Sequence, residues 1–140
     1  MRPEDPRTAI VACMDARLDA AGFLDSWPEP VHVVRNAGGR VTDDALRSLA
    51  VSCTMGAKRI AVVHHTDCAM ARHTDEQIRA LLPPGAGAGV DFLTIADPLE
   101  ALREDVEAVR GSPLLPGGIQ ASGFVYDLDS RSAREVVAGS

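Results

Sequence analysis

Short apolar runs that alternate with amphipathic segments constrain the fold of this sequence more than any other feature. Each run is apolar and bounded by polar residues, glycine or proline, as buried strands are. Strands that alternate with helices favour an α/β fold built on a parallel sheet. We therefore predict strands at residues 8–12, 31–34, 59–64 and 119–128, with a possible edge strand at 134–138.

Three segments between these runs carry helix start signals. Thr42 is followed by two acidic residues, which is typical of an N-cap and a first helical turn. Thr74 and Gln77 have the spacing of a capping box. Asp97 is followed directly by Pro98 and, three residues after Asp97, by Glu100, which together favour a helix start. The three predicted helices end at or near Gly56, Leu82 and Arg110.

The composition is that of one folded domain, which we expect to span residues 1–140. Hydrophobic residues make up 46% of the chain and charged residues 24%, which argues against disorder. The net charge of −6 disfavours nucleic acid and anionic membranes as partners, because both repel an acidic surface. No apolar run is long enough to span a bilayer, and the polar N-terminus lacks a secretory signal, so we expect a cytoplasmic protein.

Metal-binding side chains follow the first and third predicted strands. Cys13 comes directly after residues 8–12, and His65 and Cys68 follow residues 59–64. The carboxyl ends of parallel strands meet at one edge of a sheet, where ligands bind. Two thiolates and an imidazole suit Zn²⁺, and three protein ligands leave the fourth position open, as in catalytic sites. We therefore predict one zinc ion per chain, held by Cys13, His65 and Cys68.

Other interpretations of these residues stay open at this point. His64 is an alternative ligand, although its side chain should face the opposite side of the strand from His65. Cys53 lies on an apolar helix face and is expected in the core. Cys13 and Cys68 are also compatible with a thiol-redox pair, which would bind no metal. Three cysteines, an odd number, argue against a disulfide framework in a reducing compartment.

Asp15 and Arg17 follow the first cysteine closely. If this segment is extended, both side chains point to one side and can pair. An arginine keeps a neighbouring carboxylate ionised and fixes its direction. Such a carboxylate can accept a hydrogen bond from water on the metal, or it can bind the metal itself and close the site. We expect Asp15 and Arg17 to act at the zinc site rather than as an ordinary surface ion pair.

Three motifs together resemble those of the β-class carbonic anhydrases, and most of all the short branch found in archaea and many bacteria. They are Cys-Met-Asp-Ala-Arg-Leu at residues 13–18, Arg-Asn-Ala-Gly-Gly at 35–39 and His-Thr-Asp-Cys at 65–68. Residues 123–127, Gly-Phe-Val-Tyr-Asp, resemble the last long strand of that family. Each motif alone is weak or moderate, but three in the family's order form a specific signal. The likeness spans residues 8 to about 137.

The resemblance implies a small, mostly parallel sheet flanked by helices, in a homodimer or a multiple of dimers. The implied activity is that of a lyase, the reversible hydration of carbon dioxide to bicarbonate by zinc-bound hydroxide. Cys13, His65 and Cys68 correspond to the zinc ligands. Asp15 would orient the hydroxide, and Arg17 would keep Asp15 off the metal. The substrate pocket is expected at Asn36, Ala37, Gly38, Gly39 and Ala69.

The sequence departs from the family pattern in three places. Ala69 stands where this branch usually has glycine, and its β-carbon is expected to crowd the turn or to narrow the pocket. Only about seven residues precede the first strand, where the family usually has a helical arm. Residues 25–30 replace the usual approach to the second strand. Two alternatives therefore stay open: hydrolysis of carbonyl sulfide or carbon disulfide at the same zinc site, and a zinc-binding relative without turnover.

Overall fold

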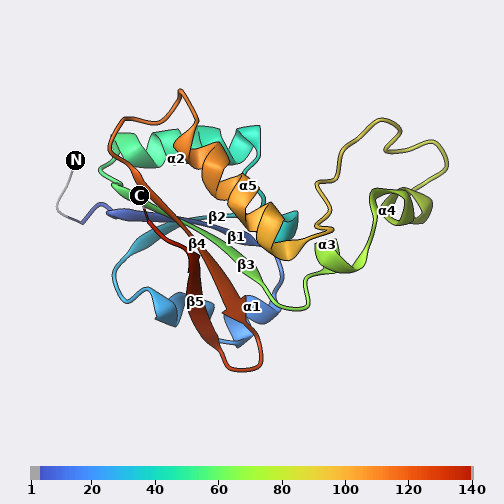
Figure 1. The fold of residues 1–140 in the computed structure, drawn as a ribbon, viewed down its shortest axis with the longest axis horizontal. Helices are drawn as coiled ribbons and strands as arrows, with labels where there is room; N and C mark the ends of the chain where they lie inside the picture. The colour runs from blue at the N-terminus through green and yellow to red at the C-terminus, as the bar shows by residue number, and fades with distance from the viewer. Residues whose placement is uncertain (1–3, 140) are drawn as a thin grey trace.

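A five-stranded sheet forms the centre of the computed structural model, which describes residues 4–139 (Figure 1). The strand order is β2-β1-β3-β4-β5; the first four strands are parallel, and β5 is antiparallel to β4. This confirms the expected α/β fold with a mostly parallel sheet. The strands are β1 (Thr8–Cys13), β2 (Val31–Asn36), β3 (Arg59–His65), β4 (Gln120–Asp127) and β5 (Ser132–Val137).

Helices cover both faces of the sheet. The longer helices α2 and α5 pack on one face, where Leu49 and Leu102 join a buried apolar cluster with the strands. Leu18 and Phe23, from two shorter elements, join a second cluster on the other face. The helical elements are α1 (Arg17–Ala20), η1 (Phe23–Ser26), η2 (Ala37–Gly39), α2 (Asp43–Thr54), α3 (Ala69–Arg72), α4 (Asp75–Leu81) and α5 (Pro98–Arg110).

The predicted helix starts are all present. The Thr42 hydroxyl accepts a hydrogen bond from the Ala45 backbone N–H at 3.2 Å. Thr74 and Gln77 form a reciprocal capping box. Asp97 caps α5 by accepting two backbone hydrogen bonds. Local capping therefore defines where each of these helices begins, as the sequence pattern predicted.

The segment after Cys13 differs from its prediction. We expected residues 13–17 to be extended, so that Asp15 and Arg17 would share one side. The strand instead ends at Cys13, and Arg17 begins helix α1. The two side chains still pair, but because the chain turns at Ala16 and not because of strand alternation.

Helix α4 and the loop that follows it project from the body of the molecule (Figure 1). This arm is held by its own contacts: the Asp75 carboxylate accepts from Thr94 Oγ1 at 2.7 Å, and the Arg79 guanidinium donates to the Val90 carbonyl at 2.6 Å. Leu81, at the end of α4, is 79% exposed. Within residues 4–139, no helix combines the length and the apolar composition needed to cross a bilayer.

Candidate metal centre

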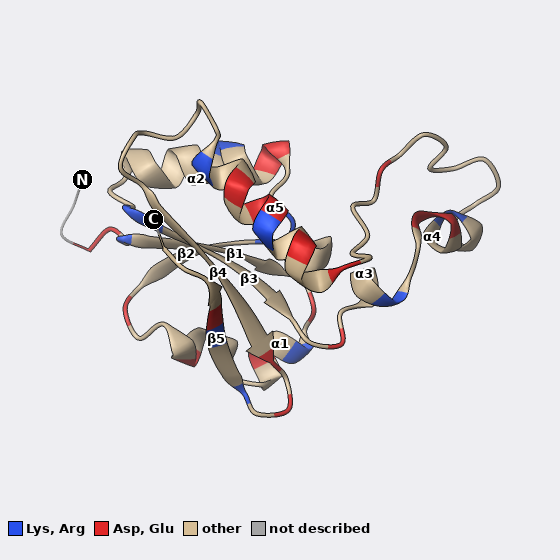
Figure 2. Cartoon of the chain, in the orientation of Figure 1, with Lys and Arg blue, Asp and Glu red and all other residues tan. Residues whose placement is uncertain are grey.

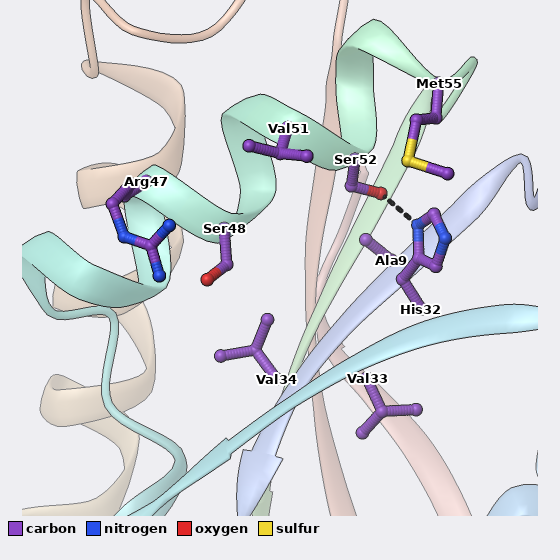
Figure 3. Close-up of a pocket in the computed structure, with 9 residues that line it drawn as sticks. All are labelled: Ala9, His32, Val33, Val34, Arg47, Ser48, Val51, Ser52 and Met55. Carbon is purple, nitrogen blue, oxygen red and sulfur yellow. Dashed lines mark hydrogen bonds between the residues drawn. The ribbon is translucent and has the colours of Figure 1, made fainter. Parts of the chain in front are cut away.

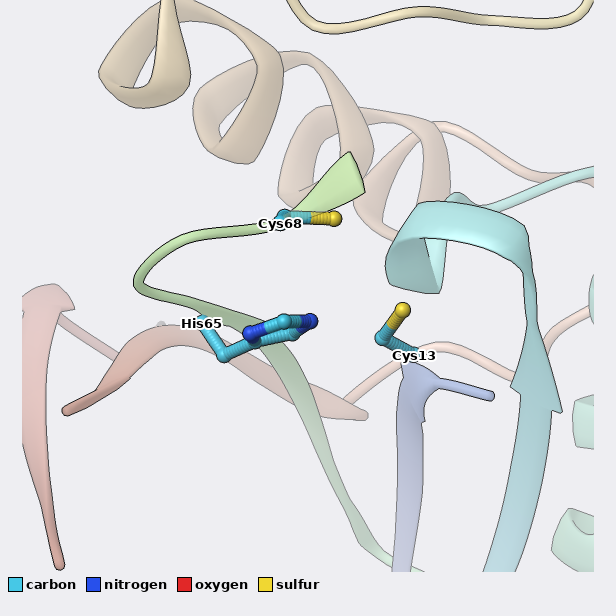
Figure 4. Close-up of side chains that lie close together, drawn as sticks. All are labelled: Cys13, His65 and Cys68. Atoms are coloured by element: carbon cyan, nitrogen blue, oxygen red, sulfur yellow. The ribbon is translucent and has the colours of Figure 1, made fainter. Parts of the chain in front are cut away.

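The side chains of Cys13, His65 and Cys68 converge on one point (Figure 4). Their possible ligand atoms all lie within 4.8 Å of one another, and all three residues are buried. Cys13 ends β1, His65 ends β3, and Cys68 follows in the turn before α3. The structure therefore brings together the three residues that the sequence singled out as metal ligands.

The position of this cluster follows from the strand order. Strand β1 lies between β2 and β3, so the chain leaves β1 to build the sheet first on one side and then on the other. Parallel α/β sheets bind ligands at the carboxyl ends of strands beside such a reversal. Cys13 and His65 lie at the carboxyl ends of the two neighbouring strands β1 and β3.

The imidazole of His65 is oriented for metal binding. Its Nδ1 lies 2.6 Å from the Thr66 carbonyl oxygen, which can only accept, so Nδ1 carries the proton. Nε2 is then an unprotonated acceptor, and it is buried with no hydrogen-bond partner among residues 4–139. A buried polar atom without a partner is costly unless something binds it. A metal ion bound to Nε2 would supply the missing partner.

A hydrogen bond between the two cysteines shifts their pKa values in opposite directions. The hydrogen bond between them lowers the pKa of Cys13, and the same bond, together with burial, raises the pKa of Cys68. Backbone N–H groups of Asp15 and Gly38 lower the pKa of Cys13 further. Thiolate sulfur and neutral imidazole are donors that Zn²⁺ prefers, so this set fits a zinc ion with a fourth position left open.

Asp15 and Arg17 form a tight pair at the edge of the cluster. Arg17 Nε donates to both carboxylate oxygens of Asp15 at 3.1 Å, and its NH2 group donates to Oδ2 at 2.7 Å. These hydrogen bonds lower the pKa of Asp15 to about 2, so the carboxylate is ionised at neutral pH. Asp15 Oδ2 lies 3.8 Å from His65 Nε2. An ionised carboxylate therefore stands beside the predicted metal position.

The turn at residues 36–39 packs directly on Cys13. The Asn36 side chain closes the turn by accepting from the Arg40 N–H at 2.8 Å and donating to the Arg40 carbonyl at 2.7 Å. Gly38 and Gly39 have positive φ angles of 86° and 66°, which favour glycine. A β-carbon on Gly39 would lie 3.0 Å from the Cys13 nitrogen and 2.9 Å from the Val63 carbonyl oxygen. Glycine is required here because backbone approaches backbone.

Ala69 does not crowd its turn. It is the first residue of α3, is exposed, and is absent from the residues with positive φ. A cavity of about 260 Å³ lies beside the turn that carries His65 and Cys68, and is walled by Ile95, Pro98 and Val125. Its lining includes neither Ala69 nor residues 36–39, so their part in a substrate pocket stays a prediction.

A larger hollow of about 390 Å³ lies elsewhere, between α2 and β2 (Figure 3). The His32 imidazole reaches across it, with Nδ1 2.7 Å from Ser52 Oγ. Val51 and Met55 give it an apolar wall. None of the three cluster residues lines this hollow, and we assign it no chemistry.

A buried ionic network beneath the cluster was not predicted from the sequence. Asp105 of α5 accepts from Arg40 Nε at 2.7 Å and lies 2.9 Å from His64 Nε2. The side chains of Arg40 and Asp105 are only 7% and 6% exposed. The signal was present: Asp105 interrupts the apolar stripe formed by Leu102 and Val106 on α5. A charged residue within such a stripe indicates a buried partner.

Comparisons with known proteins agree on one family. A family model described as carbonic anhydrase matches residues 8–108. Beta-carbonic anhydrase 1 of Mycobacterium tuberculosis is 36% identical over 137 residues, which cover 96% of this chain and 84% of that protein. A carbon disulfide hydrolase of Acidianus is 33% identical over 160 residues, covering 95% of this chain and 78% of that protein.

A solved structure shows the same fold. The carbonic anhydrase of Streptococcus mutans superposes with a TM-score of 0.82 at 40% sequence identity, and the match covers 97% of this chain and 86% of that one. The family model, the relatives and the buried cysteine–histidine–cysteine cluster all support the same family assignment. The chain therefore belongs to the β-class carbonic anhydrase family.

Proposed function

We propose that this protein catalyses the reversible hydration of carbon dioxide to bicarbonate, with one zinc ion held by Cys13, His65 and Cys68. The observation that carries the proposal is the ionised Asp15 carboxylate, fixed by Arg17, beside a buried ligand cluster with an unpartnered imidazole nitrogen. Three protein ligands with a directed carboxylate nearby support a catalytic rather than a structural metal site.

The residues of the site divide the work. A bound zinc ion supplies a Lewis acid that lowers the pKa of water enough to give a nucleophile near neutral pH. With zinc bound, Asp15 would accept a hydrogen bond from that nucleophile and so orient it toward carbon dioxide. Arg17 donates to both oxygens of Asp15 and would keep the carboxylate from binding the metal itself. The turn at residues 36–39 and Ala69 are the proposed walls of the substrate pocket.

Carbon disulfide hydrolysis is the second candidate. Carbon disulfide hydrolases match this chain at 31–33% identity, close to the 36% of the mycobacterial carbonic anhydrase. Carbon dioxide, carbonyl sulfide and carbon disulfide are linear molecules with the same electrophilic carbon, so one zinc site can attack any of them.

Parallel assays with carbon dioxide, carbonyl sulfide and carbon disulfide separate these candidates. We expect the zinc-loaded protein to hydrate carbon dioxide well above the buffer rate and to consume carbon disulfide slowly or not at all. Sulfide release without carbon dioxide hydration would assign the second activity instead. One zinc per chain with no turnover of any of the three substrates would identify a non-catalytic zinc protein. A metal-free Cys13–Cys68 disulfide would favour the redox interpretation.

Cysteine variants test the metal site itself. We expect Cys13→Ser and Cys68→Ser to lose zinc, measured as metal content per chain after dialysis, because each removes a thiolate ligand. Cys53→Ser is the matched control, since Cys53 lies on α2 away from the cluster and should keep one zinc per chain. Removal of zinc by a chelator should also lower the melting temperature, because metal binds the folded state. Equal metal content in all three variants would contradict the site.

Three broader features stay proposals. We propose a homodimer, for which the mass in solution should be twice the chain mass of 14.8 kDa. A single mass of one chain across micromolar concentrations would contradict it. The single domain spanning residues 1–140 and the cytoplasmic location are likewise predictions.

A further inference from the structure

Asp67 lies in the turn between the ligands His65 and Cys68 and has an unusual backbone conformation. Its φ is 54°, in the left-handed region that side chains other than glycine rarely adopt. Aspartate tolerates this region better than most residues, but the conformation still carries strain. A strained residue between two metal ligands indicates that the turn is shaped for a purpose beyond joining β3 to α3.

The left-handed turn presents two acceptors of Asp67 to a single guanidinium group. Arg17 NH1 donates to the Asp67 carboxylate oxygen Oδ2 at 2.8 Å, and Arg17 NH2 donates to the Asp67 carbonyl oxygen at 2.8 Å. Both bonds join residues fifty positions apart in the sequence. The side chains are about half exposed, so the pair adds little to folding stability, and its value is in geometry.

Arg17 is therefore shared between two aspartates. Its Nε and NH2 groups hold Asp15, while its NH1 and NH2 groups hold Asp67. In the sequence, Arg17 follows Cys13 closely, and Asp67 lies between His65 and Cys68. The guanidinium group thus links the directed carboxylate to the turn that carries two of the three ligands.

We propose that Asp67 is a positioning residue for the Asp15–Arg17 pair. By holding the far end of the guanidinium, it keeps Arg17 turned toward Asp15 and Asp15 away from the fourth metal position. The inference rests on the proposed function in so far as that function assigns Asp15 to the nucleophile. Without Asp67, Arg17 can rotate into solvent, and the freed Asp15 carboxylate closes the site.

Two substitutions separate positioning from turn shape. Asp67→Gly removes the carboxylate but relieves the left-handed strain and keeps the carbonyl acceptor. Asp67→Asn keeps both an acceptor oxygen and tolerance of positive φ. If Asp67 is a positioning residue, thiocyanate affinity and kcat should be highest in wild type, lower in Asp67→Asn and lowest in Asp67→Gly. If Asp67 only shapes the turn, Asp67→Gly should equal or exceed wild type in both quantities. Arg72→Ala is the control, because Arg72 contacts the other Asp67 oxygen at 3.4 Å and does not touch Arg17.

The direct readout is anion binding to the zinc-loaded proteins, measured by titration calorimetry with thiocyanate. Thiocyanate would compete with the Asp15 carboxylate for the fourth metal position. We expect Asp67→Gly to bind thiocyanate about tenfold more weakly than wild type, Asp67→Asn less affected and Arg72→Ala unchanged. Zinc content should stay at one per chain and kcat should fall more than KM changes. A zinc-bound crystal structure of Asp67→Gly should show Asp15 on the metal.

The inference and the proposed function fail separately. Wild-type thiocyanate affinity and kcat in Asp67→Gly would overturn the role of Asp67 while the proposed function stands. If wild type turns over none of the three substrates, the proposed function fails, but the order of thiocyanate affinities still decides the role of Asp67. An Asp67→Gly structure with Asp15 still on Arg17 would also overturn the inference.

Discussion

At the scale of single residues, the side-chain atoms of the cysteine–histidine–cysteine cluster are oriented by the backbone of neighbouring residues. The Thr66 carbonyl fixes the His65 ring, and N–H groups of Gly38 and Asp15 point at the Cys13 sulfur. Because these partners belong to the backbone, the ligand directions depend on how closely the surrounding turns pack. Such outer contacts commonly affect metal affinity tenfold or more.

Gly39→Ala tests this dependence. Alanine must adopt a φ of 66°, and its β-carbon would lie 2.9–3.0 Å from backbone atoms of Ala12, Cys13 and Val63. We expect a loss of about 1–2 kcal/mol in the free energy of unfolding from the left-handed conformation and a further loss of about 1–3 kcal/mol from overpacking. Zinc affinity, measured by competition with a chelating dye, should fall about tenfold because Cys13 is displaced.

Gly85→Ala is the matched control for this prediction. Gly85 has a φ of 81°, but nothing lies within 4 Å of the position of its β-carbon. In urea unfolding, Gly85→Ala should lose only the free energy of unfolding that comes from the left-handed conformation. Its zinc affinity should be unchanged. Equal zinc affinities in the two alanine variants would mean that the contact with Cys13 does not orient the ligand.

The sequence predicted that Cys13, His65 and Cys68 form one cluster, but it did not predict the contacts between the turns that carry them. Cys13, His65 and Cys68 were predictable because each lies at or after the end of an apolar strand in a parallel α/β pattern. The link from Arg17 to Asp67 was not, since it depends on a positive φ that a single sequence does not reveal. The pairing of Asp15 with Arg17 was predicted, although its stated reason, an extended segment, was wrong.

At the scale of elements, side chains of helix α5 pack directly on the backbone of strand β4 at Gly123. Gly123 allows this approach, because a β-carbon there would lie 3.0 Å from side-chain atoms of Leu102 and of Val106. The position of α5 also fixes Asp105, which lies between these two residues and bonds Arg40. Helix packing and the buried ionic network are therefore coupled.

Gly123→Ala should push α5 away from the sheet. We expect a loss of about 1–3 kcal/mol in the free energy of unfolding, measured by urea denaturation, because the β-carbon overpacks the core. Gly117→Ala is the control: its β-carbon meets nothing within 4 Å, and its φ is not positive. It should be neutral or stabilise by up to about 1 kcal/mol through the unfolded state. Equal stabilities of the two variants would show that α5 can move away from the sheet without a loss in the free energy of unfolding.

The longer elements were predictable and the shorter ones were not. Capping signals at Thr42, Thr74 and Asp97 gave three helix starts as observed. The four-residue helices α1 and α3 were missed, because one turn is too short to show the 3.6-residue periodicity of an amphipathic helix. These short helices follow Cys13 and Cys68, so the local structure next to the two cysteines was not predicted from the sequence.

At the scale of the whole molecule, one ionic network joins parts of the fold that are distant in sequence. Arg40 follows the glycine turn, donates to Asp105 of α5, and reaches the Leu93 carbonyl at the base of the arm at 2.8 Å. Asp105 also accepts from the Val41 N–H at 3.2 Å and contacts His64 of β3. The network thus ties the turn over Cys13 to a helix, a strand and the arm.

Charges elsewhere on the molecule are mixed in sign. Figure 2 shows acidic and basic residues next to one another on α2 and on α5. Ion pairs on the surface involve exposed side chains, such as those of Arg47 and Asp44, and each such pair contributes little to stability. Ionic stabilisation of the fold is therefore expected to be concentrated in the buried Arg40–Asp105 pair.

This concentration predicts how Asp105 links stability to pH. Burial alone would raise the pKa of Asp105, but its bonds to His64 and Arg40 outweigh burial and lower the pKa below 3.8. A lowered folded-state pKa stabilises the protein above the unfolded value, and this stabilisation is lost as pH falls through the folded value. Asp105→Asn removes it at every pH and leaves Arg40 buried without its counter-charge.

We therefore expect Asp105→Asn to lower the free energy of unfolding by about 3–5 kcal/mol at pH 7, measured by urea denaturation. The gap between wild type and variant should narrow as pH falls from 5 toward 3, because wild type then loses the same contribution by protonation. Asp19→Asn is the control: it breaks the exposed pair with Arg35 and should change little at either pH. A gap for Asp105→Asn that stayed constant with pH would mean that the carboxylate charge contributes nothing, and that only the shape of the side chain matters.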